Sequence, residues 1–158
     1  MWLPALGFHP VMIVTVIAIS TIYQFWLHST KIPRLGFLEK IVNTPKNHAV
    51  HHSRNIEYLD KNHAAMFMFW DHLFGTYKEY DDEVPADFGV IKGPESNNLA
   101  KIAFHEYRDI WQDVKQADNW RDKLMYTFAP PGWSPDGSTK TTKQMRAELE
   151  QEKEMQAR

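Results

Sequence analysis

The stretch VMIVTVIAISTIYQFWL fills residues Val11–Leu27 and contains no charged side chain. At about 1.5 Å rise per residue, a helix of this length nearly crosses a bilayer core of roughly 30 Å. The apolar segment Leu3–Phe8 lies directly ahead of it. A cleaved signal peptide and a buried core helix are the alternatives, but no basic segment precedes the run and no small-residue cleavage pattern follows it. The sequence therefore predicts a membrane-spanning helix.

Residues that flank this helix predict its orientation. Trp2 and Trp26 lie near its two ends, where amphipathic rings favour the headgroup layer. Basic residues follow the helix at four positions, which are Lys31, Arg34, Lys40 and Lys46. Because basic flanks remain preferentially on the cytoplasmic side, we expect an integral membrane protein whose C-terminal side is cytoplasmic.

Short helices are predicted after the membrane segment. Pro33 marks a turn, and Gly36–Val42 alternates apolar and charged residues in the manner of an interfacial helix at the membrane surface. Thr44–Pro45 combines a hydroxyl N-cap with proline at the first helical position, which predicts a helix start. Asp60 is a similar cap for a helix over KNHAAMFMFWDHLF that ends at Gly75. Both histidine-bearing stretches are therefore predicted to be helical.

Helices are also predicted in the second half of the chain. Large apolar residues recur at helical spacing over Leu99–Val114, which predicts a helix with one buried face. Asp118–Phe128 is another short helix candidate. Thr139–Arg158 is a charged tail in which Thr141 and Gln144 have capping-box spacing, so we expect a solvated, partly frayed helix. The predicted fold class is all-α, with an integral membrane helix followed by interfacial and cytoplasmic helices.

Composition limits the chemistry of the chain. Its 158 residues carry a formal net charge of −2 with scattered basic residues, which predicts no nucleic-acid binding. The absence of cysteine excludes disulfides, thiolate nucleophiles and thiolate metal ligands, so any metal is expected to bind imidazole or carboxylate. The chain has eight histidines, and their clustering within residues 48–63 matters more than their number.

Two groups of polar residues have metal-ligand spacing. His48, His51 and His52 occupy positions i, i+3 and i+4, which brings three imidazoles onto one helical face within reach of a shared metal pair. Gln24 and His28 are also four residues apart, at the predicted cytoplasmic end of the membrane helix. The alternatives are a solvent-facing helix surface or an N-cap environment for the first group, and a headgroup-binding histidine for His28. Imidazole suits iron, copper, zinc and nickel, so spacing alone does not choose the metal.

Three segments together resemble a known family. They are YQFWLHST (residues 23–30), NTPKNHAVHHSRN (43–55) and YLDKNHAAMFMFWDHLFGTY (58–77). These segments resemble the C-terminal motif block of the fatty acid hydroxylase and sterol desaturase superfamily, nearest to its alkylglycerol monooxygenase-like branch. The H-x-x-H-H box followed by W-D-x-L-F-G-T is the specific part of this resemblance, which covers Leu3–Tyr80.

The resemblance implies a helical membrane protein whose histidines bind two irons, activate O2 and abstract hydrogen from a lipid C–H bond. An electron donor is then required, and no side-chain nucleophile is expected. By this carry-over the metal ligands are His28, His48, His51 and His52.

Other residues in the motif block are candidates for weaker roles. Gln24 matches a place where some members have a further histidine, and His63 lies where relatives often carry an aromatic residue, so each is a candidate ligand or ligand-orienting residue. The carboxylate of Asp71 is a candidate to accept a ligand's imidazole N–H or to pair with Arg54, with plain helix-end structure as the alternative.

The resemblance also implies an incomplete site. Family members carry, upstream, further transmembrane helices with an H-x-x-x-H pair and another H-x-x-H-H box. Two irons need on the order of four to six ligands each, which four imidazoles cannot supply. We expect a fragment that needs a missing N-terminal half, in cis or in trans, and is inactive alone.

Three functions follow from these patterns. The first is a membrane-bound di-iron oxygenase, a lipid or sterol hydroxylase or desaturase, acting on lipid C–H bonds with O2. The second is a non-catalytic membrane-anchored protein that holds one zinc or another divalent ion. The third and weaker one is a module that seats on lipid and binds a partner. The chain divides into a hydroxylase-like membrane part (residues 1–80), a cytoplasmic helical extension (81–137) and the charged tail (138–158).

Overall fold

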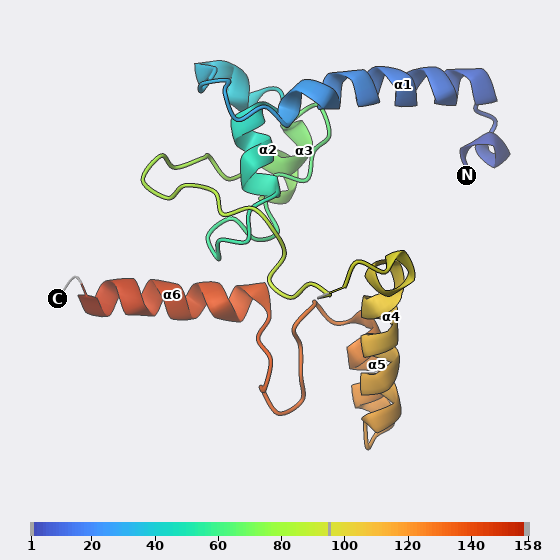
Figure 1. Cartoon of the computed structure of the whole chain (residues 1–158), viewed down its shortest axis with the longest axis vertical. Coiled ribbons are helices and arrows are strands. Elements are labelled where there is room, and N and C mark those ends of the chain that lie inside the picture. The colour runs from blue at the N-terminus through green and yellow to red at the C-terminus, as the bar shows by residue number, and fades with distance from the viewer. Residues whose placement is uncertain (1, 95, 157–158) are drawn as a thin grey trace. The chain divides into compact units, whose positions relative to one another are not determined.

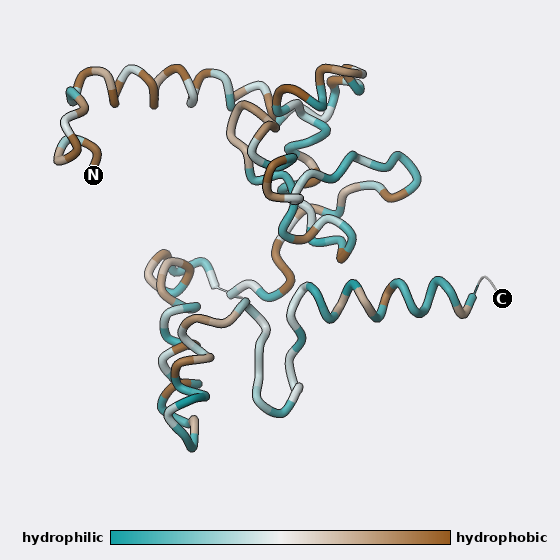
Figure 2. Tube along the Cα trace, turned by 180° about the vertical axis from the view of Figure 1, so that it is seen from behind, coloured by the Kyte–Doolittle hydropathy of each residue, from teal (hydrophilic) through white to brown (hydrophobic). Residues whose placement is uncertain are grey.

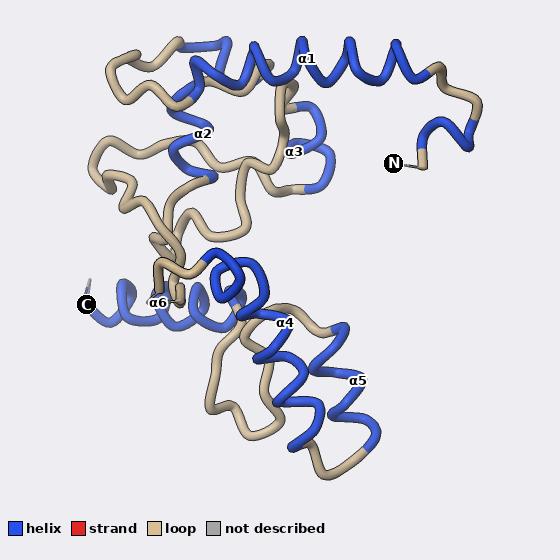
Figure 3. The backbone as a smooth tube through the Cα atoms, turned by 45° about the vertical axis from the view of Figure 1, so that its right-hand side comes forward, coloured by secondary structure: helices blue, strands red, loops and turns tan. Residues whose placement is uncertain are grey.

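The computed structural model describes residues 2–94 and 96–156 and contains two compact units. One unit ends at Gly89 and the other begins at Val90. The described residues form helices joined by loops, with no named strand among them (Figure 3). The predicted all-α class is therefore confirmed, and the described residues contain one helix that is long and apolar enough to cross a membrane.

Helix α1 (Pro10–Leu27) is the candidate membrane span. Its N-terminus is capped by His9, whose ring accepts the backbone N–H of Val11. The helix has a mean hydropathy of 1.7 over 18 residues, and these span about 27 Å. Its only buried side chains are those of Ile13 and Leu27, and Figure 2 shows apolar residues along its length. An exposed apolar surface of this kind suits lipid contact.

Four shorter helices complete the first unit. They are η1 (Leu3–Leu6), η2 (Gly36–Lys40), α2 (Pro45–His51) and α3 (Phe69–Phe74). The predicted start of α2 is confirmed, because the Thr44 hydroxyl accepts the backbone N–H of Asn47. The predicted interfacial segment forms the 3-10 helix η2, on which the Phe37 ring is exposed.

Hydrogen bonds attach the end of α1 to the start of α2. The Tyr23 hydroxyl donates to the carbonyl oxygen of Asn43 at 2.6 Å. The Asn43 side chain in turn donates to the carbonyl oxygen of Ala64 at 2.7 Å. Helix α2 packs against α1 (Figure 1). The Leu27 side chain is buried. The exit of the membrane helix is thus held against the helix that carries the histidine box.

Polar side chains make up much of the interior of this unit. The buried apolar residues are Ile13, Leu27, Val50, Tyr58 and Met68. The buried polar residues are Glu39, Asn43, Thr44, Asn47, His48, Ser53, Asn62 and Asp71. Loop backbone groups that lack helical partners bond to these side chains, as buried polar groups generally require.

The predicted helix over residues 61–74 is wrong in its first part. Only Phe69–Phe74 is helical, and Asn62 has a left-handed backbone with φ of 53°. The Asn62 side chain donates to the carbonyl oxygens of Asn47 at 3.2 Å and Lys78 at 2.8 Å and accepts the Lys78 N–H. These bonds to distant segments replace the local bonds that a helix would make, so tertiary contacts override the helical pattern.

The second unit contains three helices, α4 (Leu99–Gln116), α5 (Trp120–Phe128) and α6 (Thr142–Gln156). The three predicted helices are confirmed, and α4 packs against α5. The predicted buried face of α4 is wrong, because no side chain of this helix is buried. Thr141 and Gln144 form the predicted capping box, with Thr141 N–H donating to the Gln144 side chain at 2.8 Å.

We predict that Ile19→Asp weakens membrane insertion of the chain. Ile19 is exposed near the middle of α1, where an aspartate makes insertion less favourable by about 3 kcal/mol. Alkaline carbonate extraction should release the variant and retain the wild-type chain. Leu99→Asp, on an exposed apolar residue of the second unit, is the matched control and should stay in the membrane pellet. Retention of the Ile19 variant would contradict a spanning role for α1.

Candidate metal centre

Three histidines converge where α1 ends and α2 runs past it. His28 is the C-cap of α1, His48 lies within α2, and His52 is the C-cap of α2. The Nε2 atom of His48 lies 3.2 Å from Nε2 of His28 and 3.0 Å from Nε2 of His52. One ligand nitrogen from each of these residues falls within 4.8 Å of the others. We call His28, His48 and His52 the histidine trio.

Two nitrogen separations in the trio fit binding to one transition-metal ion. Imidazole nitrogens bind such ions at about 2.1 Å, so two ligand nitrogens on one ion are about 3.0–3.4 Å apart. The two short Nε2 separations in the trio, 3.0 and 3.2 Å, have this value. A donor set of neutral imidazoles suits iron, zinc, copper or nickel. The residues present therefore fit a bound metal, although their geometry does not select one.

The tautomer of His28 is set by the backbone of α1. Its Nδ1 atom lies 3.2 Å from the carbonyl oxygen of Gln24, which can only accept, so Nδ1 donates and Nε2 keeps its lone pair. Metal-binding histidines commonly have this arrangement. The Gln24 side chain points elsewhere, because its amide donates to the Ser20 hydroxyl at 2.9 Å. Gln24 thus contacts the trio through its backbone carbonyl.

The surroundings of His48 and His52 favour neutral imidazole rings. Burial, followed by the neighbouring rings of His52, His28 and His51, lowers the pKa of His48 to about 4. Burial and neighbouring histidines also lower the pKa of His52. His48 is therefore unprotonated at neutral pH, the form in which imidazole offers a lone pair to a metal.

The other two histidines of the motif block lie beside the trio. The His51 ring centroid is 5.2 Å from that of His52 and 5.7 Å from that of His48. The His51 centroid is also 5.8 Å from that of His63. The structure thus brings together all four histidines of residues 48–63, with His28 joining from α1.

Asp71 and Arg54 bond to different partners and do not pair with each other. The buried Asp71 carboxylate accepts the backbone N–H groups of His63 at 2.8 Å and Ala64 at 2.9 Å, and the Thr76 hydroxyl at 2.5 Å. Arg54 instead pairs with Asp87 at 2.7 Å. Asp71 therefore holds the loop that carries His63 in place.

Sequence reasoning missed two polar residues that support this loop. Thr76 donates its hydroxyl to Asp71, and Asn62 holds the backbone beside His63. The W-D-x-L-F-G-T element contains both Asp71 and Thr76, and this five-residue separation was the available signal for their pairing.

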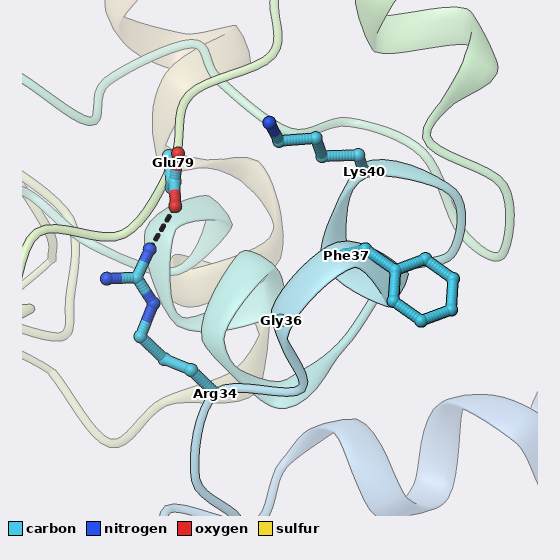
Figure 4. Close-up of a pocket in the computed structure, with 5 residues that line it drawn as sticks. All are labelled: Arg34, Gly36, Phe37, Lys40 and Glu79. Atoms are coloured by element: carbon cyan, nitrogen blue, oxygen red, sulfur yellow. Dashed lines mark hydrogen bonds and ion pairs between the residues drawn. The ribbon is translucent and has the colours of Figure 1, made fainter.

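A shallow hollow of about 450 Å³ also occurs in the first unit, away from the histidines. It is lined by Arg34, Gly36, Phe37, Lys40 and Glu79 (Figure 4). Arg34 forms an ion pair with Glu79 and lies 3.5 Å from Asp82, so neighbouring carboxylates balance its charge. The hollow offers no metal-binding group comparable to the trio.

Comparison with known proteins agrees with this geometry. The Fatty acid hydroxylase family matches residues 1–76, which include the membrane helix and every histidine of the motif block. The matched part of the chain belongs to the fatty acid hydroxylase family. No solved structure matches the chain significantly.

Relatives of this family member include alkylglycerol monooxygenases. The protein from Homo sapiens is 36% identical over 116 residues, which are 73% of this chain and 26% of the human protein. That from Danio rerio is 35% identical over 119 residues, covering 75% of this chain and 26% of the fish protein. The ornithine lipid hydroxylase OlsE from Rhizobium tropici is 27% identical over 86 residues, covering 54% of this chain and 26% of OlsE. The chain spans about a quarter of the length of these relatives.

We predict that Asp71→Ala destabilises the first unit by roughly 3 kcal/mol. The change leaves two backbone N–H groups and one hydroxyl without their acceptor. The free energy of unfolding is measured by chemical unfolding in detergent, with circular dichroism as the signal. Asp82→Ala is the matched control, because Asp82 is 62% exposed in surface ion pairs that are worth under about 1 kcal/mol. Equal stability of the two variants would show that the Asp71 bonds do not hold this unit together.

Proposed function

We propose that this chain carries the C-terminal metal-binding part of a membrane-bound, iron-dependent lipid oxygenase. The observation that carries the proposal is the histidine trio, with Nε2 atoms 3.0 and 3.2 Å apart at the end of an apolar 18-residue helix. Its relatives include an alkylglycerol monooxygenase and an ornithine lipid hydroxylase, both named for lipid oxidation. The proposed substrate class is a membrane lipid, and O2 is the co-substrate.

The position of the trio supports a lipid substrate. His28 directly follows α1, so a metal on the trio would lie where the apolar span meets the headgroup layer. A lipid in the same leaflet would reach this depth without leaving the membrane. The basic residues after α1, among them Lys31 and Arg34, support a cytoplasmic position for this end.

The residues of this chain would hold and orient the metal. When bound, iron would supply the activation of O2 and the removal of a hydrogen atom from a lipid C–H bond. The Gln24 carbonyl keeps the proton of His28 on Nδ1, which leaves Nε2 for the metal. The low pKa of His48 keeps its ring neutral at the pH of the cell. Electrons would come from a separate donor.

The ligands of this chain would fill only part of a di-iron site. We propose that two irons bind when further ligands join the histidine trio and His51, supplied by an N-terminal half in cis or in trans. Two irons need on the order of four to six ligands each, more than these imidazoles offer. The chain's coverage of about a quarter of each relative agrees with this division of ligands.

A non-catalytic zinc site is the second candidate function. Three imidazoles around one ion also suit zinc, which binds three protein ligands and leaves a fourth position open in many sites. The observation that favours it is the size of the cluster, since the described residues gather one group of three ligands. This protein would bind one ion tightly and oxidise no lipid.

A chimera tests the proposed activity. We predict that an alkylglycerol monooxygenase whose aligned quarter is replaced by this chain oxidises an ether lipid with O2. His48→Ala in the chimera should lower the rate more than about 100-fold, because it removes the central imidazole of the trio. His105→Ala is the control, since His105 lies on α4 in the second unit. A His48 variant with an unchanged rate would overturn the proposal.

The chain on its own should behave differently. We predict that the purified chain does not retain a full pair of irons through purification and forms no oxidised product from a lipid, because its imidazoles are too few to complete the coordination of two irons. Iron analysis and mass spectrometry of incubated lipid measure the two quantities. Two bound irons together with turnover would contradict the proposed division of ligands.

A further inference from the structure

His51 and His63 form a second pair of facing imidazoles beside the histidine trio. Their ring planes cross at 83°. Neighbouring rings of the trio cross at nearly the same angles, 85° for His28 and His48 and 84° for His48 and His52. Both His51 and His63 are exposed, so their nitrogens are reachable by a ligand from solvent. The pair thus repeats the arrangement of rings that the trio uses.

The separation of the pair fits a shared ion. With metal–nitrogen distances of about 2.1 Å, the centroids of two imidazoles on one ion lie roughly 4.5–6 Å apart. The centroids of His51 and His63 are 5.8 Å apart, and those within the trio range from 4.5 to 5.5 Å. Both rings are exposed and free to turn about their side-chain bonds, so this centroid separation is compatible with one ion bound by both imidazoles.

The backbone that carries His63 is held from both sides. The Asp71 carboxylate accepts the N–H groups of His63 and Ala64, and the buried Asn62 bonds to Lys78 and Asn47. A ligand on a loop binds more tightly when the loop is already in place, because little ordering entropy is lost. The first unit thus presents His63 on a preorganised loop.

An ion at this pair would lie next to the trio. His51 is adjacent to His52 in the chain, and their ring centroids are 5.2 Å apart. Paired metal ions in proteins are commonly about 3.5–4 Å apart, which neighbouring ligands on one helix can support. His63 therefore lies beside His51, the histidine of α2 that is not part of the trio, where a second ion would need a ligand.

We propose that His63 is a metal-binding residue that forms, with His51, a second site for a divalent transition-metal ion beside the histidine trio. This inference rests on the proposed metal binding of the trio. It raises the number of imidazoles that this chain contributes from four to five. The remaining ligands of the second ion would come from water or from another polypeptide segment.

Zinc titration of the full chain in detergent micelles tests this site. With 13C-labelled histidine, NMR signals of the imidazole rings are followed as Zn²⁺ is added, and assignments come from single His→Ala variants. We expect the trio signals to shift with the first equivalent and those of His51 and His63 to shift together with a second. His63→Ala should weaken the second binding step at least about tenfold and leave the first unchanged. His105→Ala, which replaces a half-buried histidine of the second unit, should change neither step.

The outcomes separate this inference from the proposed function. If the NMR signals of the trio shifted at saturating zinc while those of His63 did not, the second site alone would be overturned. The same conclusion would follow if His63→Ala left both binding steps unchanged while circular dichroism showed a folded chain. If no histidine signal moved, both the second site and the metal-binding role of the trio would be overturned.

Discussion

The carboxylate of Asp71 and the three groups that bond to it determine how the first unit is arranged. Two backbone N–H groups and the Thr76 hydroxyl reach this buried carboxylate. Hydrogen bonds to a charged acceptor are stronger than those between neutral groups, and they hold a loop that has no helix or sheet ladder of its own. This loop joins α2 to α3 and places His63 beside the histidine box. Without the carboxylate, the backbone N–H groups would be buried without a partner.

The interior of the first unit is polar because the large apolar residues of α1 lie mostly on its outside. Most large apolar side chains of α1 face outward, where lipid would cover them, so they contribute little to a core inside the unit. The segments after α1 are short and contain many loops, whose backbone groups need partners when they are buried. Asn43, Asn47 and Asn62 supply them, each through a side-chain amide that donates to a carbonyl oxygen elsewhere in the unit. Such bonds depend on position and direction, so they specify one arrangement of loops more narrowly than apolar contacts do.

The dependence of the loops on long-range hydrogen bonds explains which features could be predicted from the sequence. Periodic features were predictable: the membrane helix, the Thr44 cap of α2, and the helices of the second unit have patterns that local physics explains. The loop over residues 61–68 was not, because its conformation depends on Asn62 and Asp71 bonding to segments distant in the chain. The histidine spacing predicted that three rings share one face of α2. It could not show that His28 would approach His48 more closely than His51 does, since that depends on the packing of α1 against α2.

The end of α1 links membrane insertion to the chemistry of His28. Carbonyl groups in the last turn of a helix lack hydrogen-bond donors within the helix. Near the hydrocarbon core, few water molecules are available to donate to them instead. The His28 ring meets this need for Gln24 through its Nδ1 atom, 3.2 Å from the carbonyl oxygen. The same bond keeps the proton on Nδ1 and leaves the Nε2 lone pair directed toward His48, 3.2 Å away. A side chain with only one polar atom could satisfy the helix end or bind the metal, but not both. Histidine at the end of the membrane helix therefore satisfies the backbone at the membrane surface and completes the trio with one side chain.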